Sequence, residues 1–395
     1  MFDLKAIVRP NIIKLEPYRC ARDDFKTGIL LDANENTHGP ALSEPSALEL
    51  ELELNRYPDP HQEELKQQIV DSRNGTPNMH ATRKVTVENL CLGVGSDESI
   101  DMLMRCCCAP AREKLLVCPP TYGMYSICAA VNDVEIVKVP LTVPDFQIDV
   151  EAIVSKLESE TGVKLIYLTS PGNPTGKLIS VDTIISLLEK VQDGWNGLVV
   201  VDEAYIDFTA PPQDGFSQSM ATLVNQYPNL VVMQTLSKSF GLAGIRLGVT
   251  FCNAQLSKIL NSVKYPYNIS SLTSDVALKA TSPRGIAVMQ RYVKSINEQR
   301  DLVLAKILAL EYVGRNLGGL DSNFILVEIL DKEKKPSNEV ALKLYNTLAV
   351  DNAVVVRFRG NELNCTGGLR ISIGTTEENQ VMLSKLERVL LELNK

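Results

Sequence analysis

Residues 235–246 of this 395-residue chain read TLSKSFGLAGIR, shortly after the apolar run 230–233. Lys238 stands between two serines in this stretch, and Arg246 ends it. A lysine ammonium at the end of a core strand is costly to bury unless it is paired, and forming an imine with a carbonyl cofactor is one use for such an amine. Taken alone, the stretch fits a solvated surface lysine in a strand-to-loop turn better.

The composition is that of an ordinary globular protein. The chain is 45% hydrophobic and 22% charged, and it is long enough for two domains with a substantial core. The net charge is -8 and no basic tract occurs, so neither nucleic acid nor an acidic membrane surface is a predicted partner. The first residues lack the apolar core of a signal peptide and no apolar run has membrane-spanning length, which predicts a cytoplasmic protein.

The nine cysteines and three histidines do not have the spacing of disulfides or metal sites. No C-x-x-C pair occurs, and Cys106, Cys107 and Cys108 fall within a helical pattern. An odd number of cysteines in a long chain without a signal peptide predicts reduced thiols that are mostly packed in the core. No metal site is predicted, because no histidines are at ligand spacing.

Apolar, strand-like runs alternate with helical periods between residues 61 and 265. Strands are expected near 90–92, 115–118, 135–139, 165–169, 198–202, 230–233 and 247–251. Helices are expected at 97–108, 124–131, 150–159 and 181–191. This alternation predicts an α/β fold in which helices cover both faces of a mostly parallel, seven-stranded sheet. Ligands bind such sheets outside the carboxyl ends of the strands.

Three of the expected strands are followed by polar or aromatic residues. The first leads into Gly95, Ser96 and Asp97 at a helix start, where backbone amides, a hydroxyl and the positive helix end suit a phosphate. The second is followed by Tyr122, which could stack on a ring, and the fourth by Asn173, which could donate to a ligand. Alternatively, Ser96 or Asp97 caps a helix, Tyr122 packs in the core, and Asn173 belongs to a simple turn.

The fifth expected strand ends in Asp202, and Tyr205 follows it closely. A carboxylate at the inner end of a core strand is costly unless a cation lies opposite, such as a protonated pyridine nitrogen. Tyr205 could hydrogen-bond a phenolic oxygen of the same ligand. A helix cap or a loop carboxylate explains Asp202 equally well in isolation. Together with Lys238, these residues describe a pyridoxal phosphate site.

The order of these residues resembles that of the fold-type I aminotransferases. The resemblance implies pyridoxal 5'-phosphate as the cofactor, with Lys238 bound to it covalently and later moving the substrate proton, and with Asp202 keeping the pyridine nitrogen protonated. The remaining implied cofactor contacts are Asn173 and Tyr205 at the phenolic oxygen, Tyr122 on the ring, and Gly95, Ser96, Asp97, Ser237 and Arg246 around the phosphate.

A narrower resemblance covers essentially the full chain. Its motifs outside the core are Pro17-Tyr18-x-x-Ala21-Arg22, Leu31-Asp32-Ala33-Asn34-Glu35-Asn36, Asn55-Arg56-Tyr57-Pro58-Asp59 and Gly368-Leu369-Arg370-Ile371-Ser372-Ile373-Gly374-Thr375. These motifs are similar to the histidinol-phosphate aminotransferase family. The resemblance implies a homodimer with shared active sites, in which Tyr57 reaches the cofactor phosphate of the other subunit. Valine stands at position 94, where that family usually has asparagine, so only backbone contacts are expected there.

The chain is expected to divide into three parts. Residues 1–37 form an arm that joins the smaller domain, residues 38–270 a large cofactor-binding domain, and residues 271–395 the smaller domain. The elements expected outside the large sheet are helices at 43–54, 274–310 and 377–393 and strands at 323–329, 354–358 and 369–373.

Arg357 and Arg370 would lie on neighbouring strands of the smaller domain. Each fits a surface salt bridge, but two arginines facing a cleft could instead grip a phosphate or a carboxylate. With Tyr18 and Asn34, they are the expected substrate contacts. In the resembled family the same pocket serves histidinol phosphate in one half reaction and 2-oxoglutarate or glutamate in the other.

The resemblance implies a transaminase of L-histidine biosynthesis that converts L-histidinol phosphate and 2-oxoglutarate to imidazole-acetol phosphate and L-glutamate. Two related enzymes are alternatives: an aromatic amino acid aminotransferase and a decarboxylase of threonine phosphate. A non-enzymatic regulatory domain of the same fold is a further alternative. It is disfavoured because Lys238 is present and no basic helix-turn-helix segment precedes residue 37.

Overall fold

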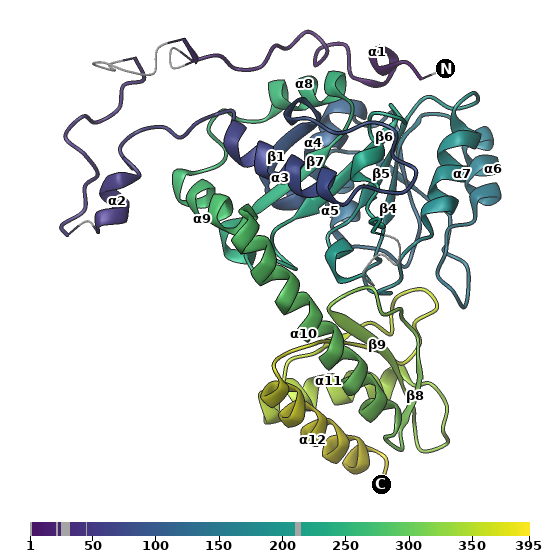
Figure 1. The fold of residues 1–395 in the computed structure, drawn as a ribbon. Coiled ribbons are helices and arrows are strands. Elements are labelled where there is room, and N and C mark those ends of the chain that lie inside the picture. Colours follow the sequence, from purple (N-terminus) through teal and green to yellow (C-terminus); the bar gives the residue numbers. More distant parts are fainter. Residues whose placement is uncertain (1, 21–22, 25–31, 45, 210–214) are drawn as a thin grey trace.

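The computed structural model describes residues 2–20, 23–24, 32–44, 46–209 and 215–395. Ala21, Arg22 and Leu31, which belong to two of the sequence motifs, lie outside these residues. The described chain forms two β-sheets, and the long helix α10 (Pro283–Leu308) runs from one to the other (Figure 1).

The larger sheet contains seven strands among the described residues, in the order β1-β7-β6-β5-β4-β2-β3. Their bounds are Leu90–Val94 (β1), Lys114–Val117 (β2), Glu135–Lys138 (β3), Val163–Thr169 (β4), Leu198–Asp202 (β5), Leu230–Thr235 (β6) and Leu247–Phe251 (β7). β7 is antiparallel to both β1 and β6, and the other neighbours are parallel. The predicted α/β fold with a mostly parallel, seven-stranded sheet is confirmed.

Helices cover both faces of this sheet. One face packs against α1 (Leu4–Ile7), α4 (Gly95–Cys107), α5 (Met124–Val131) and α8 (Ala254–Val263). The other face packs against α3 (Glu63–Gly75), α6 (Val150–Ser159), α7 (Val181–Val191), α9 (Ser271–Thr281) and the 3-10 turn η4 (Ala221–Leu223). Every residue of β5 and β6 is buried because both faces are covered, which is why these strands appear in the sequence as mostly apolar runs.

The reversed direction of β7 decides where residues 235–246 lie. They connect β6 to β7, so Lys238 follows the carboxyl end of β6 and Arg246 immediately precedes β7 at the same edge of the sheet. β1 is antiparallel to β7 and therefore parallel to β6, so α4 also begins at this edge. The other 3-10 turns are η2 (Val87–Asn89), η3 (Ile206–Phe208) and η5 (Ala243–Ile245).

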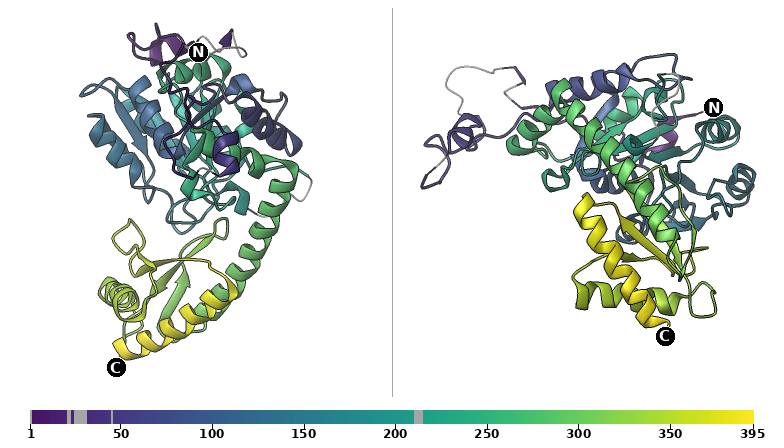
Figure 2. Two further views of the ribbon diagram at one scale, coloured as in Figure 1. Left: turned by 90° about the vertical axis from the view of Figure 1, so that its left-hand side faces the viewer. Right: turned by 60° about the horizontal axis from the view of Figure 1, so that its bottom comes forward.

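The smaller sheet contains four antiparallel strands among the described residues, in the order β10-β11-β9-β8. Its elements are β8 (Val313–Asn316), β9 (Phe324–Ile329), α11 (Asn338–Asn352), β10 (Arg357–Phe358), β11 (Gly368–Ser372) and α12 (Thr376–Leu393). Side chains of α10, α11 and α12 complete its apolar core, and Figure 2 shows α10 and α12 beside the strands. β8 and α11 are absent from the predicted elements, whereas the strands near 323–329 and 369–373 are confirmed.

The helix predicted over residues 274–310 is in fact two helices, α9 and α10. Ser282 follows α9, and its hydroxyl accepts a hydrogen bond from the backbone of Gly285 as the N-cap of α10. Pro283, the first residue of α10, has no N–H with which to continue α9. The helix predicted over 43–54 is also shorter, at Ala47–Glu51 (α2).

The amino-terminal residues follow two courses. Leu4, Ile7 and Val8 are buried in the core of the larger sheet, so this part of the arm does not join the smaller domain as predicted. Their apolar side chains lie on the helical turn α1, and packing them against the sheet removes that surface from water. By contrast, α2 has no buried residue and protrudes from the body (Figures 1 and 2). The domain boundary at residue 270 stays a prediction.

The cysteines belong to the core. All nine lie within the described residues and are unpaired, and eight are buried, which confirms the prediction of packed thiols. Burial raises the pKa of both Cys106 and Cys108 to about 12, so neither is a ready thiolate. Within the described ranges, no helix combines the length and the apolar character needed to cross a membrane.

Candidate active site

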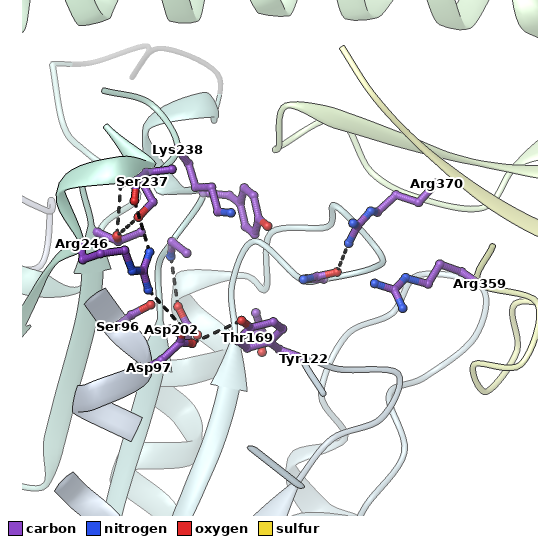
Figure 3. Close-up of a pocket in the computed structure, with 15 residues that line it drawn as sticks. Ser96, Asp97, Tyr122, Thr169, Asp202, Ser237, Lys238, Arg246, Arg359 and Arg370 are labelled. Carbon is purple, nitrogen blue, oxygen red and sulfur yellow. Dashed lines mark hydrogen bonds and ion pairs between the residues drawn. The ribbon is translucent and has the colours of Figure 1, made fainter. Parts of the chain in front are cut away.

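A cavity of about 290 Å³ lies at the carboxyl edge of the larger sheet, facing the smaller one. Its lining residues are Ser96, Asp97, Tyr122, Thr169, Asn173, Asp202, Ala204, Tyr205, Thr235, Ser237, Lys238, Ala243, Arg246, Arg359 and Arg370. Figure 3 shows Arg359 and Arg370 entering from the carboxyl-terminal strands, on the side opposite Ser96, Ser237 and Arg246. One site thus draws on the carboxyl ends of five strands of the larger sheet, β1, β2, β4, β5 and β6, and on two arginines, one in the smaller sheet and one directly after its strand β10.

Lys238 is held at the cavity by its own loop. Its carbonyl accepts a hydrogen bond from Gly241 N at 3.0 Å, and the next residue, Ser239, donates its hydroxyl to Asp207 at 2.5 Å. The lysine side chain stays accessible to solvent because the cavity is open. Partial burial and the charge of nearby Arg370 lower the pKa of the Lys238 amine. A lower pKa increases the fraction of neutral amine, the form that attacks a carbonyl or takes a proton.

Asp202 ends β5 with only 2% of its surface exposed. Tyr125 donates its hydroxyl to Oδ2 at 2.9 Å, and the backbone N–H of Ala204 donates to Oδ1 at 3.2 Å. Burial raises the pKa of Asp202 to about 6, and these two hydrogen bonds oppose the rise. A cation bound opposite the carboxylate would restore its ordinary acidity, so the position suits a protonated ring nitrogen.

An anion-binding corner lies at the start of α4. Gly95 has φ +76°, and a Cβ there would come within 2.5 Å of Nη2 of Arg246. A Cβ on Gly248 would come within 2.4 Å of the carbonyl carbon of Gly95, so both glycines are needed for β7 to approach this helix end. The arginine, the hydroxyls of Ser96 and Ser237, and the positive end of the 13-residue helix then surround one small volume. Its size and charge suit a phosphate.

Asp97 and Tyr122 connect this corner to the middle of the cavity. Asp97 forms an ion pair with Arg246 at 3.3 Å and accepts a hydrogen bond from the hydroxyl of Tyr122 at 3.2 Å. Burial raises the pKa of Tyr122, with the charge of Asp97 as the next cause, so the phenol stays protonated. Tyr122 therefore presents a neutral ring beside a charged corner, as the predicted stacking requires.

Asn173 and Tyr205 complete the wall toward the smaller sheet. Oδ1 of Asn173 accepts a hydrogen bond from Arg370 at 2.6 Å. The ring of Tyr205 packs edge-on against Phe324, and its centroid lies 5.7 Å from Nζ of Lys238. The structure thus brings the predicted cofactor residues of five strand ends, except Gly95, into the lining of one cavity, while their individual roles stay predictions.

The arginines of the smaller sheet differ from the prediction in one respect. Arg357 lies opposite Arg370 in the ladder of β10 and β11, but its side chain is exposed and does not line the cavity. Arg359, two residues along the same strand direction, does line it. Arg359 directly follows the two-residue strand β10, so no strand pattern in the sequence marked it as a cavity residue.

Arg359 and Arg370 form a strongly cationic wall. Burial lowers the pKa of both guanidinium groups, and their mutual repulsion lowers the pKa of Arg370 further. Nε of Arg359 is buried and has no hydrogen-bond partner among the described residues. A buried donor without a partner is costly, so this wall is suited to receive an anion.

Tyr18, Asn34 and Tyr57 do not line this cavity in the single chain. Tyr57 stacks on Tyr267 with ring centroids 4.6 Å apart, and Tyr18 meets the same ring edge-on at 5.7 Å. Asn34 is exposed and has φ 56°. Their predicted contacts with cofactor and substrate stay predictions. The lining residues Thr169, Ala204, Thr235 and Ala243 are absent from the predicted set because their small side chains gave no chemical signal, although Thr235 and Ala243 lie within the stretch 235–246.

The chain is similar to known aminotransferases over its whole length. The family model described as aminotransferase class I and II matches residues 26–386. Histidinol-phosphate aminotransferase of Candida maltosa is 70% identical, with 100% of each chain covered. The Saccharomyces cerevisiae protein of the same name is 53% identical, covering 100% of this chain and 99% of its own.

A solved structure supports the fold. Histidinol-phosphate aminotransferase from Sinorhizobium meliloti, in complex with pyridoxal-5'-phosphate, superposes with a TM-score of 0.73 at 21% sequence identity, covering 91% of this chain and 90% of its own. At this identity the likeness concerns the fold, which is that of the fold-type I transferases. The chain therefore belongs to the class I and II aminotransferases and, within them, to the histidinol-phosphate aminotransferase family.

Proposed function

We propose that the protein transfers the amino group of L-histidinol phosphate to 2-oxoglutarate, giving imidazole-acetol phosphate and L-glutamate in L-histidine biosynthesis, with pyridoxal 5'-phosphate as cofactor. The observation that carries the proposal is the distribution of charge in the cavity. An anion-binding corner beside Arg246 and a cationic wall of Arg359 and Arg370 lie on opposite sides. Cofactor and substrate each carry a phosphate, so two separate anion sites are required.

The residues of the cavity fit the cofactor. Ser96, Ser237 and Arg246 would hold its phosphate, Asp202 its ring nitrogen, and Lys238 its aldehyde carbon. Tyr122, Asn173 and Tyr205 would contact the ring and its phenolic oxygen. When bound, the cofactor accepts the electron pair released as the Cα–H bond of the substrate breaks.

Lys238 is the group that moves the proton. Its amine would take up the Cα proton of the bound substrate, because its lowered pKa makes the neutral, proton-accepting form more abundant. The same amine can return the proton to the neighbouring carbon, which completes the exchange. Asp202 stays charged throughout and keeps the ring nitrogen protonated.

The arginine wall would receive the substrates in turn. Arg370 and Arg359 can donate to the phosphate of histidinol phosphate in one half reaction and to a carboxylate of 2-oxoglutarate in the other. The Asn173–Arg370 hydrogen bond fixes the direction of one guanidinium before substrate arrives. Arg357, the predicted partner of Arg370, pairs with it across the strands but is exposed outside the cavity lining, so Arg359 takes its place in the proposed wall.

A homodimer in the cytoplasm is the proposed working form. The protruding α2 exposes Leu48 and Leu50, and Tyr18 and Tyr57 are about half exposed, which suits contact with a second copy. In that arrangement Tyr57, Tyr18 and Asn34 would serve the neighbouring active site. Eight buried, unpaired cysteines support a reducing compartment.

The test is a titration of the purified holoenzyme with L-histidinol phosphate, following the absorbance of the bound cofactor. Conversion to the pyridoxamine form, and its reversal by 2-oxoglutarate, is the expected result. Lys238→Ala should abolish turnover, whereas Lys343→Ala, which removes an exposed lysine of α11 paired with Glu339, should not. Release of carbon dioxide, or better turnover of phenylalanine than of histidinol phosphate, would contradict the proposed substrate.

A further inference from the structure

We propose that Tyr125 is a positioning residue for the reaction, because its hydroxyl orients the carboxylate of Asp202 and holds it in the charged form. This inference rests on the proposed function, in which Asp202 faces the ring nitrogen of the cofactor. Tyr125 itself does not line the cavity, so it touches neither substrate nor cofactor and acts through Asp202.

Tyr125 is fixed in place by packing. Its side chain is fully buried in the first turn of α5. Its ring lies between Tyr122, edge-on with centroids 5.7 Å apart, and Tyr167, tilted at 4.8 Å. The ring has no room to turn away, so the direction of its hydroxyl is set by the core. That hydroxyl lies 2.9 Å from Oδ2 of Asp202.

The direction of the hydrogen bonds around Tyr125 follows from the number of protons. A phenol has one proton, and a carboxylate can only accept, so Tyr125 donates to Asp202. The hydroxyl of Thr169, 2.8 Å from that of Tyr125, must then donate to it, and Thr121, 3.0 Å further on, can donate to Thr169. Three hydroxyls thus point their protons toward one carboxylate, and each donor strengthens the next.

The charge of Asp202 depends on this arrangement. Burial favours the protonated acid, and the hydrogen bond from Tyr125 is the largest influence in the opposite direction on its pKa. The other titratable groups that face Asp202 are Asp97 on α4, Tyr122 before α5, Tyr167 on β4, Tyr205 after β5 and Lys238 after β6. Without the phenol proton, Asp202 would take up a proton at higher pH and would keep only the hydrogen bond from the backbone of Ala204 to fix its orientation.

Tyr167 provides a matched control. It is also fully buried, it lies against Tyr125, and its hydroxyl donates to the backbone carbonyl of Ile100 at 3.0 Å. Tyr125→Phe and Tyr167→Phe each remove one buried hydroxyl from the same cluster. The first breaks the hydrogen bonds with Asp202 and Thr169, and the second breaks the one with the carbonyl of Ile100 inside α4. The melting temperature of the apoprotein should fall in both variants, and further in Tyr125→Phe because two hydrogen bonds are lost there, whereas only Tyr125→Phe should affect Asp202.

The experiment compares the affinity of apoprotein for pyridoxal 5'-phosphate with that for the analogue in which carbon replaces the ring nitrogen. In Tyr125→Phe the affinity for the natural cofactor should fall about tenfold while the analogue is bound as in the wild type, since only the natural ring needs a charged Asp202. The acid limb of the pH profile of kcat/KM should also move to higher pH. Tyr167→Phe should leave the affinity ratio and the profile unchanged.

Equal affinity ratios in the two variants would overturn the inference. If Tyr125→Phe does not fold, Thr169→Val removes the next hydroxyl of the chain and should change the ratio in the same direction by about threefold, since only the support of the last hydrogen bond is lost. No change in that variant would also overturn it. A wild-type protein that binds the cofactor without turning over histidinol phosphate would instead contradict the proposed function.

Discussion

The two faces of the larger sheet differ at the carboxyl end of β5, where each holds one buried carboxylate. Asp202 continues the face covered by α4 and α5 and opens into the cavity. Glu203 continues the face covered by α3 and η4 and does not line the cavity. We call the surroundings of Asp202 the cavity side and those of Glu203 the closed side. Each residue is 2% exposed, and successive residues of a strand point to opposite faces.

Asp202 and Glu203 differ in the number of hydrogen bonds that their carboxylates accept. Glu203 accepts three: from the hydroxyl of Ser219 and the N–H of Met220, both at 2.6 Å, and from the amide of Gln234 at 2.8 Å. Asp202 accepts two and keeps acceptor capacity toward the cavity. Burial raises the pKa of both, to about 6 for Asp202 and about 7 for Glu203. A perturbed pKa therefore does not identify the functional carboxylate, whereas unused acceptors facing a cavity do.

The largest effect is expected from a substitution on the cavity side, at Asp202. Asp202→Asn keeps the shape of the side chain but cannot hold a proton on the ring nitrogen, so kcat should fall roughly a thousandfold. The melting temperature of the apoprotein should hold or rise, because a buried charge has been removed. Steady-state kinetics and thermal melting measure the two effects. A variant that keeps more than a tenth of wild-type turnover would show that Asp202 has no such task.

A substitution on the closed side, at Glu203, should lower the free energy of unfolding rather than kcat. Glu203→Gln places an amide donor against groups that already donate, so unfolding should become easier by about 1–3 kcal/mol while kcat stays within a few fold. Denaturant titrations with parallel kinetics test both statements. A loss of turnover as large as that of Asp202→Asn would mean that the two faces are not separate in function.

The pH dependence of this stability difference has a definite sign. The folded protein binds the Glu203 proton more tightly than the unfolded chain, so between about pH 4.5 and pH 7 the contribution of Glu203 to the stability of the wild type falls as pH rises. Glu203→Gln lacks this contribution. The stability gap between wild type and variant should therefore narrow toward pH 8, and a gap that widens would contradict the raised pKa.

The sequence predicts the cavity side far better than the closed side. Asp202, Lys238 and Arg246 lie in recognisable order, and the strands that carry them are apolar runs because both faces of the sheet are covered. The three partners of Glu203 lie 16, 17 and 31 residues away, with no motif to connect them. Only folding brings them together.

Other features of the fold could not be predicted from the sequence, because they too depend on contacts between distant residues. The reversal of β7 depends on pairing with β1 and β6 and leaves no local signal. Strand β10 is only two residues long, so neither its register nor the inward course of Arg359 could be derived from hydrophobic pattern. The boundary between α9 and α10 at Ser282-Pro283 is the exception. A serine followed by a proline is a common helix start, so the sequence alone could have predicted two helices here.

The smallest effect is expected from the hydrogen bonds that connect the closed side with the loop of Lys238. Arg73 donates from Nε to Gln234 at 2.8 Å and from Nη1 to Asp207 at 2.9 Å, and Asp207 in turn accepts the hydroxyl of Ser239, the neighbour of Lys238. The network of Glu203 thus reaches the loop that carries the reactive amine. Pocket residues on the cavity side are not part of it.

Ser239→Ala removes the last bond of this network and should cost about 1 kcal/mol, since Asp207 keeps its bond to Arg73. kcat should fall by no more than about threefold, because β6 and β7 still hold both ends of the loop. Ser262→Ala, which removes a hydroxyl bonded within its own helix, is the matched control and should change neither. If kcat fell more than tenfold at unchanged melting temperature, the closed side would be positioning Lys238, and the separation of the two faces would fail at this one residue.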